Sequence, residues 1–222
     1  MAINKVVNSS SKSHGAMRNA IGYVLRSDKV TEGYVDVTGP YGSDEIDRNG
    51  VYKSFLNEKK QWGKDSGRMY SHNVISFHKN EKISPAQCLE IGKTFVGRFF
   101  GGFQSLLGIH QDKDHLHCHI ITNTVSFIDG HKLHQTKHDL EEQKAYTNQL
   151  CRDRGLSVAE KGRHFNGSQI EEGQITAWNK DKYNLLASES KKSYLADCAI
   201  AIMEVVPGSA SREEFVQKMA ER

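Results

Sequence analysis

Hydrophobic and polar residues follow two periodic patterns along the chain, and each pattern predicts one kind of secondary-structure element. Period-two alternation with β-branched residues predicts strands, and apolar residues three and four apart, with capping residues in front of them, predict helices. The expected strands cover residues 3–8, 33–38, 68–78, 103–110, 115–126 and a short stretch at 131–135, and the expected helices cover residues 14–27, 44–62, 84–101, 138–154 and a last segment that starts at Ser211. This order predicts an α+β fold with a central, mostly antiparallel five-stranded sheet flanked by helices.

A Gly-rich polar stretch at about residues 160–173 divides the chain into two expected parts. We expect a main domain over residues 1–165 and a helical C-terminal extension over residues 166–222, packed on or beside the main domain. Ser211 and Glu214 have capping-box spacing, and the helix that they start meets no stop signal before the sequence ends. We therefore expect the sequence to be part of a longer protein.

Composition narrows the class of protein. The 222 residues carry a net charge of only +3, which excludes binding to nucleic acid through bulk positive charge alone. The chain has no apolar run of the ~18–20 residues that cross a bilayer and no hydrophobic signal segment at its start, so we expect a cytoplasmic protein without membrane insertion. Of the 11 histidines, most lie between residues 110 and 138, which directs attention to one segment.

The clustered histidines lie on a predicted β-hairpin. Alternate side chains of a strand share a face, so His115, His117 and His119 point the same way, together with Asn123. His110 ends the preceding strand and lies within cross-strand reach of them. Three imidazoles on one side of an ion leave other coordination positions open, which is typical of a catalytic metal site. The alternative interpretation is a hydrophilic strand face with solvated histidines.

The other polar groups of this segment have less certain roles. His115 is nearest the turn and is the weakest candidate ligand, and Asp112 in the turn is a candidate to accept a proton from a histidine ring. We expect His131, His134 and His138 to be surface residues.

The first predicted helix carries a candidate nucleophile beside its apolar stripe. Met17, Ala20, Ile21 and Val24 form the stripe, and Tyr23 lies about 100° away from it on the flank. A tyrosine there packs against the core or presents its hydroxyl to a site beside the sheet. Tyrosine oxygen becomes a good nucleophile only when a metal, a base or a cation lowers its pKa from about 10.

The segment HQDKDHLHCHIITN, residues 110–123, resembles the third motif of conjugative relaxases, the P-type mobilization nucleases of the histidine–hydrophobic–histidine endonuclease superfamily. Three departures are mild: Lys113 takes the place of the usual threonine, His115 takes the polar position that is often asparagine, and Cys118 takes the hydrophobic position. The resemblance implies three metal ligands, His110, His117 and His119.

Three further segments are similar to the same family. AIGYVLRSDK is similar to the first motif, which implies that Tyr23 is the nucleophile. HNVISFHKNEKISPAQ is similar to the middle motif and adds Ser76 and Glu81, and HDLEEQKAYTNQLCRDRGLSV is similar to the helix that follows the site. The resemblance covers about residues 3–160.

The resemblance implies a relaxase, a metal-dependent endonuclease and DNA strand transferase that nicks single-stranded DNA at an origin of transfer (oriT) during conjugation or mobilization of a mobile genetic element. The expected product is a 5′-phosphotyrosyl intermediate with a free 3′-hydroxyl, and the expected ion is Mn²⁺ or Mg²⁺. Expected partners are single-stranded and hairpin oriT DNA, an accessory DNA-binding protein and a conjugative coupling protein. The candidates for a base or for support of the site are Asp112, Glu81, His115, Asn123 and Ser76. The candidate DNA-binding residues are Lys5, Arg26, Lys29, Arg68, Lys132, Lys137 and Arg163.

Three other functions share parts of this pattern. A rolling-circle replication initiator has the same metal site but usually places its tyrosine after the histidine motif, where this chain has Tyr146. A non-catalytic metal-binding or nucleic-acid-binding module needs no nucleophile. A three-histidine zinc hydrolase forms no covalent intermediate with DNA.

Overall fold

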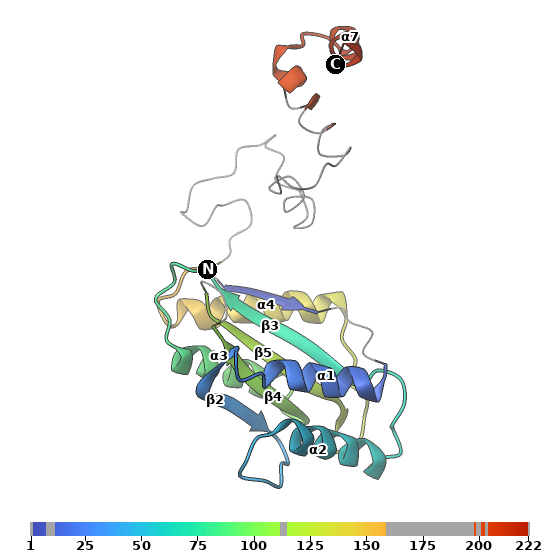
Figure 1. Cartoon of the computed structure of the whole chain (residues 1–222), viewed down its shortest axis with the longest axis vertical. Coiled ribbons are helices and arrows are strands. Elements are labelled where there is room, and N and C mark those ends of the chain that lie inside the picture. The colour runs from blue at the N-terminus through green and yellow to red at the C-terminus, as the bar shows by residue number, and fades with distance from the viewer. Residues whose placement is uncertain are drawn as a thin grey trace. The chain divides into compact units, whose positions relative to one another are not determined.

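The computed structural model describes residues 2–7, 12–111, 115–158, 198, 201–202 and 204–221. Residues 2–126 contain an antiparallel sheet with the strand order β1-β3-β5-β4-β2 (Figure 1). The strands are β1 (Ala2–Val6), β2 (Val30–Thr38), β3 (Tyr70–Phe77), β4 (Phe103–His110) and β5 (His117–Ser126). The predicted α+β class and the five-stranded antiparallel sheet are confirmed.

Each helix begins at a polar side chain that accepts a hydrogen bond from its first turn. The helices are α1 (His14–Val24), α2 (Arg48–Gln61), α3 (Pro85–Phe99), α4 (Lys137–Arg152) and α7 (Arg212–Ala220), with a 3₁₀ turn at Val206–Gly208. Their capping residues are Ser13, Asp47, Ser84, Thr136 and Ser211. Ser84 and Thr136 form complete capping boxes, with Gln87 and Asp139.

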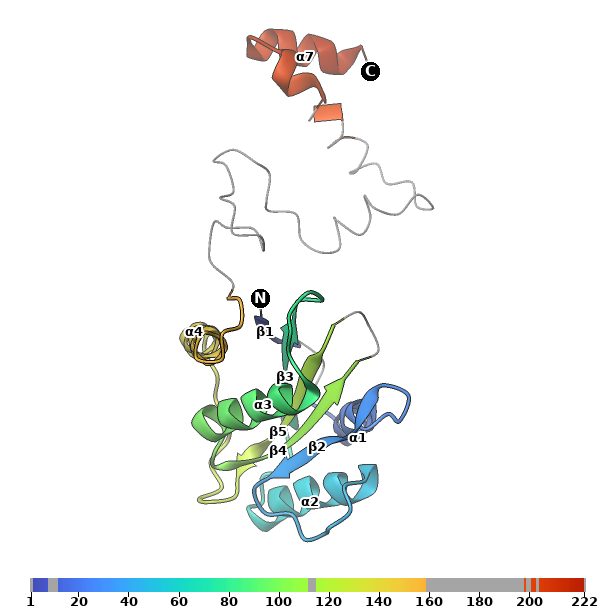
Figure 2. The same cartoon turned by 90° about the vertical axis from the view of Figure 1, so that its left-hand side faces the viewer.

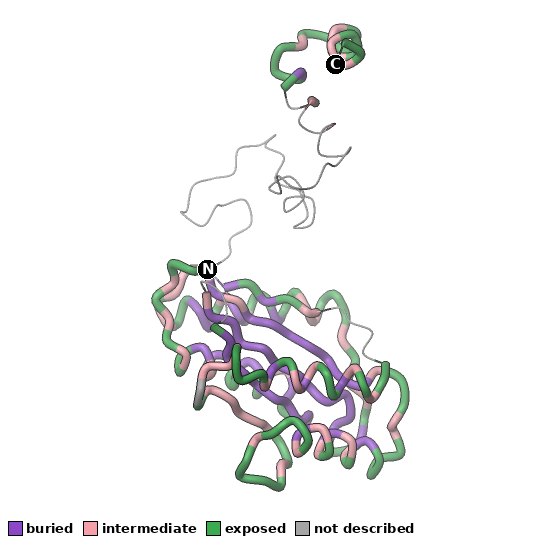
Figure 3. Tube along the Cα trace, in the orientation of Figure 1, coloured by how far each residue is buried: buried purple, intermediate pink, exposed green. Residues whose placement is uncertain are grey.

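Helices cover both faces of the sheet, so the described parts of β4 and β5 are buried throughout (Figures 2 and 3). Helices α1 and α2 pack on one face, where Met17, Ile21 and Phe55 meet Leu106 and Ile121. Helices α3 and α4 pack on the other face, where the core includes Ile91, Phe95, Leu107, Cys118 and Leu150. The apolar stripe predicted for the first helix is confirmed, since Met17, Ile21 and Val24 are fully buried.

Several element boundaries differ from the expected ones. Helix α1 ends at Val24 rather than at residue 27, and α2 starts only after Asp47, because that carboxylate accepts from the Asn49 and Gly50 amides. The strand expected at 131–135 is reduced to one bridge between Val125 and Lys132. Ser211 caps α7, but Glu214 bonds to the Ala210 amide instead of closing the capping box.

The chain divides into two units, residues 1–166 and 167–222. The expected linker at 160–173 lies outside the described residues, and the packing of 166–222 on the main domain stays a prediction. Within the described part of the chain, every helix is too short or too polar to cross a membrane.

Gly108 on β4 allows α1 to approach the sheet. It lies opposite His119, and a Cβ built at this position would stand 2.6 Å from Val24 Cγ1 and 3.1 Å from the Val24 carbonyl oxygen. Both distances are shorter than ordinary van der Waals contacts, so the close packing of the last turn of α1 on β4 depends on a residue without a side chain.

Gly108→Ala is expected to lower the free energy of unfolding by about 1–3 kcal/mol, because the methyl group forces α1 away from β4. The matched control is Gly97→Ala in α3, where a Cβ meets nothing within 4 Å and the substitution is expected to stabilise the helix by about 0.5–1 kcal/mol. Urea unfolding of both variants measures the difference, and equal effects would contradict the close packing at Gly108.

Lys59, in the last turn of α2, is a fully buried lysine. Its ammonium donates a 3.0 Å hydrogen bond to Thr124 Oγ1. Burial, assisted by the charge of Lys132, lowers the pKa of Lys59 to about 7. The folded-state pKa therefore lies below the unfolded value, and the unfolded chain binds one more proton between about pH 7 and pH 10.4. The destabilisation is fully present below pH 7 and fades as the pH rises through this interval.

In the wild-type chain, Lys59 is expected to make the free energy of unfolding rise between pH 7 and pH 10, by up to roughly 1.4 kcal/mol per pH unit. Lys59→Met is expected to reduce this rise, because the titrating group is lost. Urea unfolding at several pH values measures it. Lys60→Met, which removes an exposed neighbouring charge, is the control and should keep the wild-type slope. An unchanged slope in Lys59→Met would contradict the assignment.

Candidate active site

Three histidines meet at one end of the β4–β5 pair. His110 lies directly opposite His117, and Gly108 lies opposite His119, so all three imidazoles stand on the α1 face of the sheet. One ring nitrogen of each histidine lies within 4.8 Å of the others, and all three residues are buried. The spacing and the donor type fit a divalent cation held from one side. The juxtaposition expected from the strand alternation is therefore present.

The main chain of α1 fixes one of these rings. His110 Nε2 lies 2.9 Å from the carbonyl oxygen of Val24. A carbonyl oxygen only accepts hydrogen bonds, so in the neutral ring Nε2 carries the proton and Nδ1 carries the lone pair. Helix α1 thus selects the tautomer of His110 that presents Nδ1 to a metal.

A fourth histidine, His72 on β3, contacts the site from the neighbouring strand. Its Nε2 lies 3.0 Å from His119 Nδ1, and the two ring centroids are 5.2 Å apart. Burial, together with the charges of His110 and Lys5, lowers the pKa of His72 to about 4, so its imidazole is neutral near pH 7. The nitrogen of His119 that faces away from His72 is Nε2.

Tyr23 stands over the histidines at the end of α1. Its ring centroid is 5.4 Å from that of His110 and 5.4 Å from that of His119, and the residue is 37% exposed. The Lys29 ammonium lies 5.5 Å from the centre of the same ring, which is cation–π range. Tyr23, which lies off the apolar stripe of α1, therefore borders both the histidines and solvent.

The supporting residues expected from the sequence take different places. Ser76 on β3 lies directly opposite His117, on the same face of the sheet. His115 is half-buried, with its ring 4.8 Å from that of His117, but outside the three-histidine group. Asn123 shares the histidine face but is fully buried beneath α2, where its amide donates to the Phe55 carbonyl and to Gln104.

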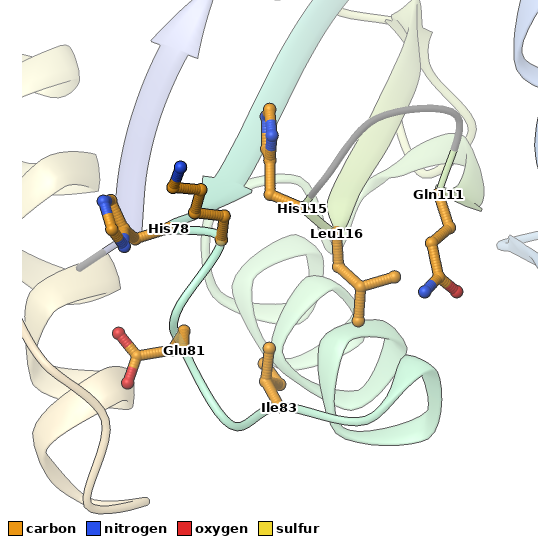
Figure 4. A pocket seen from close by; sticks show the side chains of 7 residues that line it. His78, Glu81, Ile83, Gln111, His115 and Leu116 are labelled. Carbon is orange, nitrogen blue, oxygen red and sulfur yellow. The ribbon is translucent and has the colours of Figure 1, made fainter.

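Glu81 lies in the loop after β3, at a small polar pocket shown in Figure 4. Its carboxylate accepts hydrogen bonds from the hydroxyl and the amide of Ser157, the amide at 3.2 Å. Burial raises the pKa of Glu81, but hydrogen bonds, including those from Ser157, outweigh burial and hold the pKa below its usual value. His115 lines the same pocket. Asp112, the other candidate base, lies outside the described residues.

The candidate DNA-binding residues divide by position. Lys29 borders Tyr23, and exposed Lys5 lies on the histidine face, paired with Val74, which in turn pairs with His119. Arg26 is bound by Asp28 at 2.6 Å.

The remaining candidates lie elsewhere. Lys137 is exposed at the start of α4. Arg68 and Lys132 lie at the far end of β5, where Arg68 bonds to Ser71 and Lys132 donates to main-chain carbonyls. Arg163 lies outside the described residues.

Three groups that shape the surroundings of the three histidines were not predicted from the sequence: His72, Gly108 and the Val24 carbonyl. The sequence did hold a signal for His72. It lies two residues before Val74 and four before Ser76 on one predicted strand, and alternate residues of a strand share a face. The strand order that brings β3 beside β5 was not available from this pattern.

A buried three-histidine group that could hold a metal ion lies on an antiparallel sheet, and the exposed ring of Tyr23 borders it. A sequence profile of the relaxase family, described as the MobA/VirD2-like nuclease domain, matches residues 23–156. The chain belongs to this family. The matched segment begins at Tyr23 and includes all three histidines.

Curated relatives agree with this assignment, and one solved structure shares the fold. Protein rlx of Staphylococcus aureus is 30% identical over 171 residues, covering 77% of this chain and 49% of the relative. The group II intron-interrupted relaxase LtrB of Lactococcus lactis is 31% identical over 68 residues, covering 30% of this chain and 12% of the relative. The manganese-bound crystal structure of the MobM relaxase domain with oriT DNA covers 78% of this chain and 95% of that chain, at 12% identity and a TM-score of 0.51, and so shares the fold. The chain spans about half the length of the rlx protein.

His117→Ala is expected to weaken Mn²⁺ binding by more than about 100-fold if His117 binds the ion directly, because the loss of an outer partner alone weakens binding by about 10–100-fold. Isothermal titration calorimetry measures the change. The matched control is His115→Ala, which removes a neighbouring imidazole outside the three-histidine group. An equal loss in both variants would contradict the ligand assignment.

Proposed function

We propose that this chain is the nuclease part of a relaxase that nicks one strand of oriT DNA by transesterification. The observation that carries the proposal is the position of the Tyr23 ring, 5.4 Å from the rings of both His110 and His119. In a metal-assisted in-line displacement, the nucleophile and the metal site border the same phosphate. Membership of the relaxase family supports the same reaction.

In the proposed step, the Tyr23 oxygen attacks the phosphorus of the scissile phosphodiester. A bond forms between phosphorus and the tyrosine oxygen, and the bond to the 3′ oxygen breaks. The tyrosine loses its proton, and the departing 3′ oxygen takes one up, so a free 3′-hydroxyl and a 5′-phosphotyrosyl link result. One phosphodiester replaces another, so the reverse reaction can rejoin the strand.

The histidine group is proposed to hold Mn²⁺ or Mg²⁺. When bound, the ion supplies Lewis-acid stabilisation of the charge that develops on the phosphate oxygens. The protein keeps His110 in the required tautomer through the Val24 carbonyl. Because Val24 follows Tyr23 in α1, the helix that presents the nucleophile also orients one ligand.

Local positive charge is proposed to guide single-stranded DNA to the site. Lys29 lies beside Tyr23, and Lys5 lies on the open side of the histidine face, near exposed Ile3. Backbone phosphates can meet these ammonium groups without a large net charge on the protein. In the bacterial cytoplasm, an accessory DNA-binding protein and a coupling protein would complete the assembly that the family resemblance implies.

The position of Tyr146 disfavours the replication-initiator alternative. Tyr146 lies on α4, where it packs against the core on the opposite face of the sheet. Its ring is 5.6 Å from that of Phe99 and 4.7 Å from the Arg98 guanidinium. The sheet separates this tyrosine from the three histidines.

Tyr23→Phe is expected to abolish the covalent protein–DNA adduct while leaving Mn²⁺ affinity unchanged, because only the nucleophilic oxygen is lost. Denaturing gels with labelled single-stranded oligonucleotides that tile the origin region measure the adduct, with and without EDTA. Tyr146→Phe is the matched control and should retain the adduct. An adduct in Tyr23→Phe that disappears in Tyr146→Phe would favour the replication initiator.

A further inference from the structure

We propose that His72 is a positioning residue for the metal site, which sets the tautomer of His119 and so the nitrogen that His119 offers to the ion. His72 pairs with Ile121 on β5, two residues beyond His119, on the same face of the sheet. Its Nε2 is 3.0 Å from His119 Nδ1, and only 9% of the residue is exposed. This inference rests on the proposed metal site and adds a residue that the ligand pattern does not contain.

The chemistry of two neutral imidazoles defines the direction of this hydrogen bond. Each neutral ring has one N–H donor and one lone pair, so one ring donates and the other accepts. His119 can bind a cation through Nε2 only when that nitrogen carries the lone pair, which places the proton on Nδ1. His119 Nδ1 then donates to His72 Nε2, and His72 carries its own proton on Nδ1.

Two ligands of the site therefore have outer partners from different elements. The Val24 carbonyl of α1 accepts from His110, and His72 of β3 accepts from His119. Outer partners of this kind fix the orientation of a ligating ring as well as its tautomer. The His72 partner is uncharged, so it orients His119 without adding the negative charge that a carboxylate would bring beside the cation.

A buried histidine such as His72 also contributes to the packing of the core. The test must therefore separate the loss of its hydrogen bond to His119 from a loss of packing. His72→Gln places an amide oxygen near the former Nε2 and retains an acceptor for the His119 N–H. His72→Leu retains bulk and removes the acceptor. His131→Leu is the matched control, because it removes an exposed histidine that bonds to Asp129 away from the site.

Calorimetric titration with Mn²⁺ is expected to give His72→Leu an affinity about 10–100-fold below wild type, with His72→Gln within about threefold of wild type. His131→Leu should bind as wild type does. Thermal unfolding of each variant reports whether the fold is kept. Wild-type affinity in a folded His72→Leu would overturn the proposal.

A second readout uses the unmodified, metal-free chain and does not depend on any variant folding. Nitrogen-15 spectra of the histidine rings are expected to show the His119 proton on Nδ1. A proton on Nε2 would overturn the positioning role even if Mn²⁺ binds. Absence of Mn²⁺ binding by the wild-type chain would instead remove the proposed metal site, and the role of His72 with it, so the two failures are distinguishable.

Discussion

The pairing of His110 with His117 across β4 and β5 is the constraint on which the site depends. Side chains of a strand alternate between faces, so a slip of one residue in this register would turn one histidine away from the other. The same register places Gly108 opposite His119, where the missing side chain admits the end of α1. One ladder of main-chain hydrogen bonds thus positions the three histidines and makes room for the helix that carries Tyr23.

Burial on both faces of the sheet makes this register specific. Ile121 and Leu106 pack under α1 and α2, while Cys118 and Leu107 pack against the α3 side. A shifted strand would exchange these sets and bring the histidines into the apolar core between β5 and α3. The stability of the core and the geometry of the site therefore rest on the same pairing.

The sequence predicted most of the elements and the grouping of the three histidines because both depend on local periodicity. Alternation placed His117 and His119 on one face, and the 3.6-residue period set Tyr23 apart from the buried stripe. Local periodicity does not predict contacts that depend on strand order. The approach of His72 to His119 requires β3 to lie beside β5, and the contact of His110 with the Val24 carbonyl has no side-chain signal in the sequence. Asn123 shows the limit of face assignment, since it lies on the histidine face yet packs beneath α2. The bridge at Lys132 shows that a short alternating run does not by itself make a strand.

We propose that Tyr23 and the three histidines act on one phosphodiester. The most direct measurement is mass spectrometry of proteolytic peptides after reaction of the wild-type chain with Mn²⁺ and single-stranded origin-region DNA. If Tyr23 is the nucleophile, the peptide containing Tyr23 carries the nucleotide through a phosphotyrosyl bond. A nucleotide attached to the peptide containing Tyr146, or cleaved DNA without any attached peptide, would contradict it.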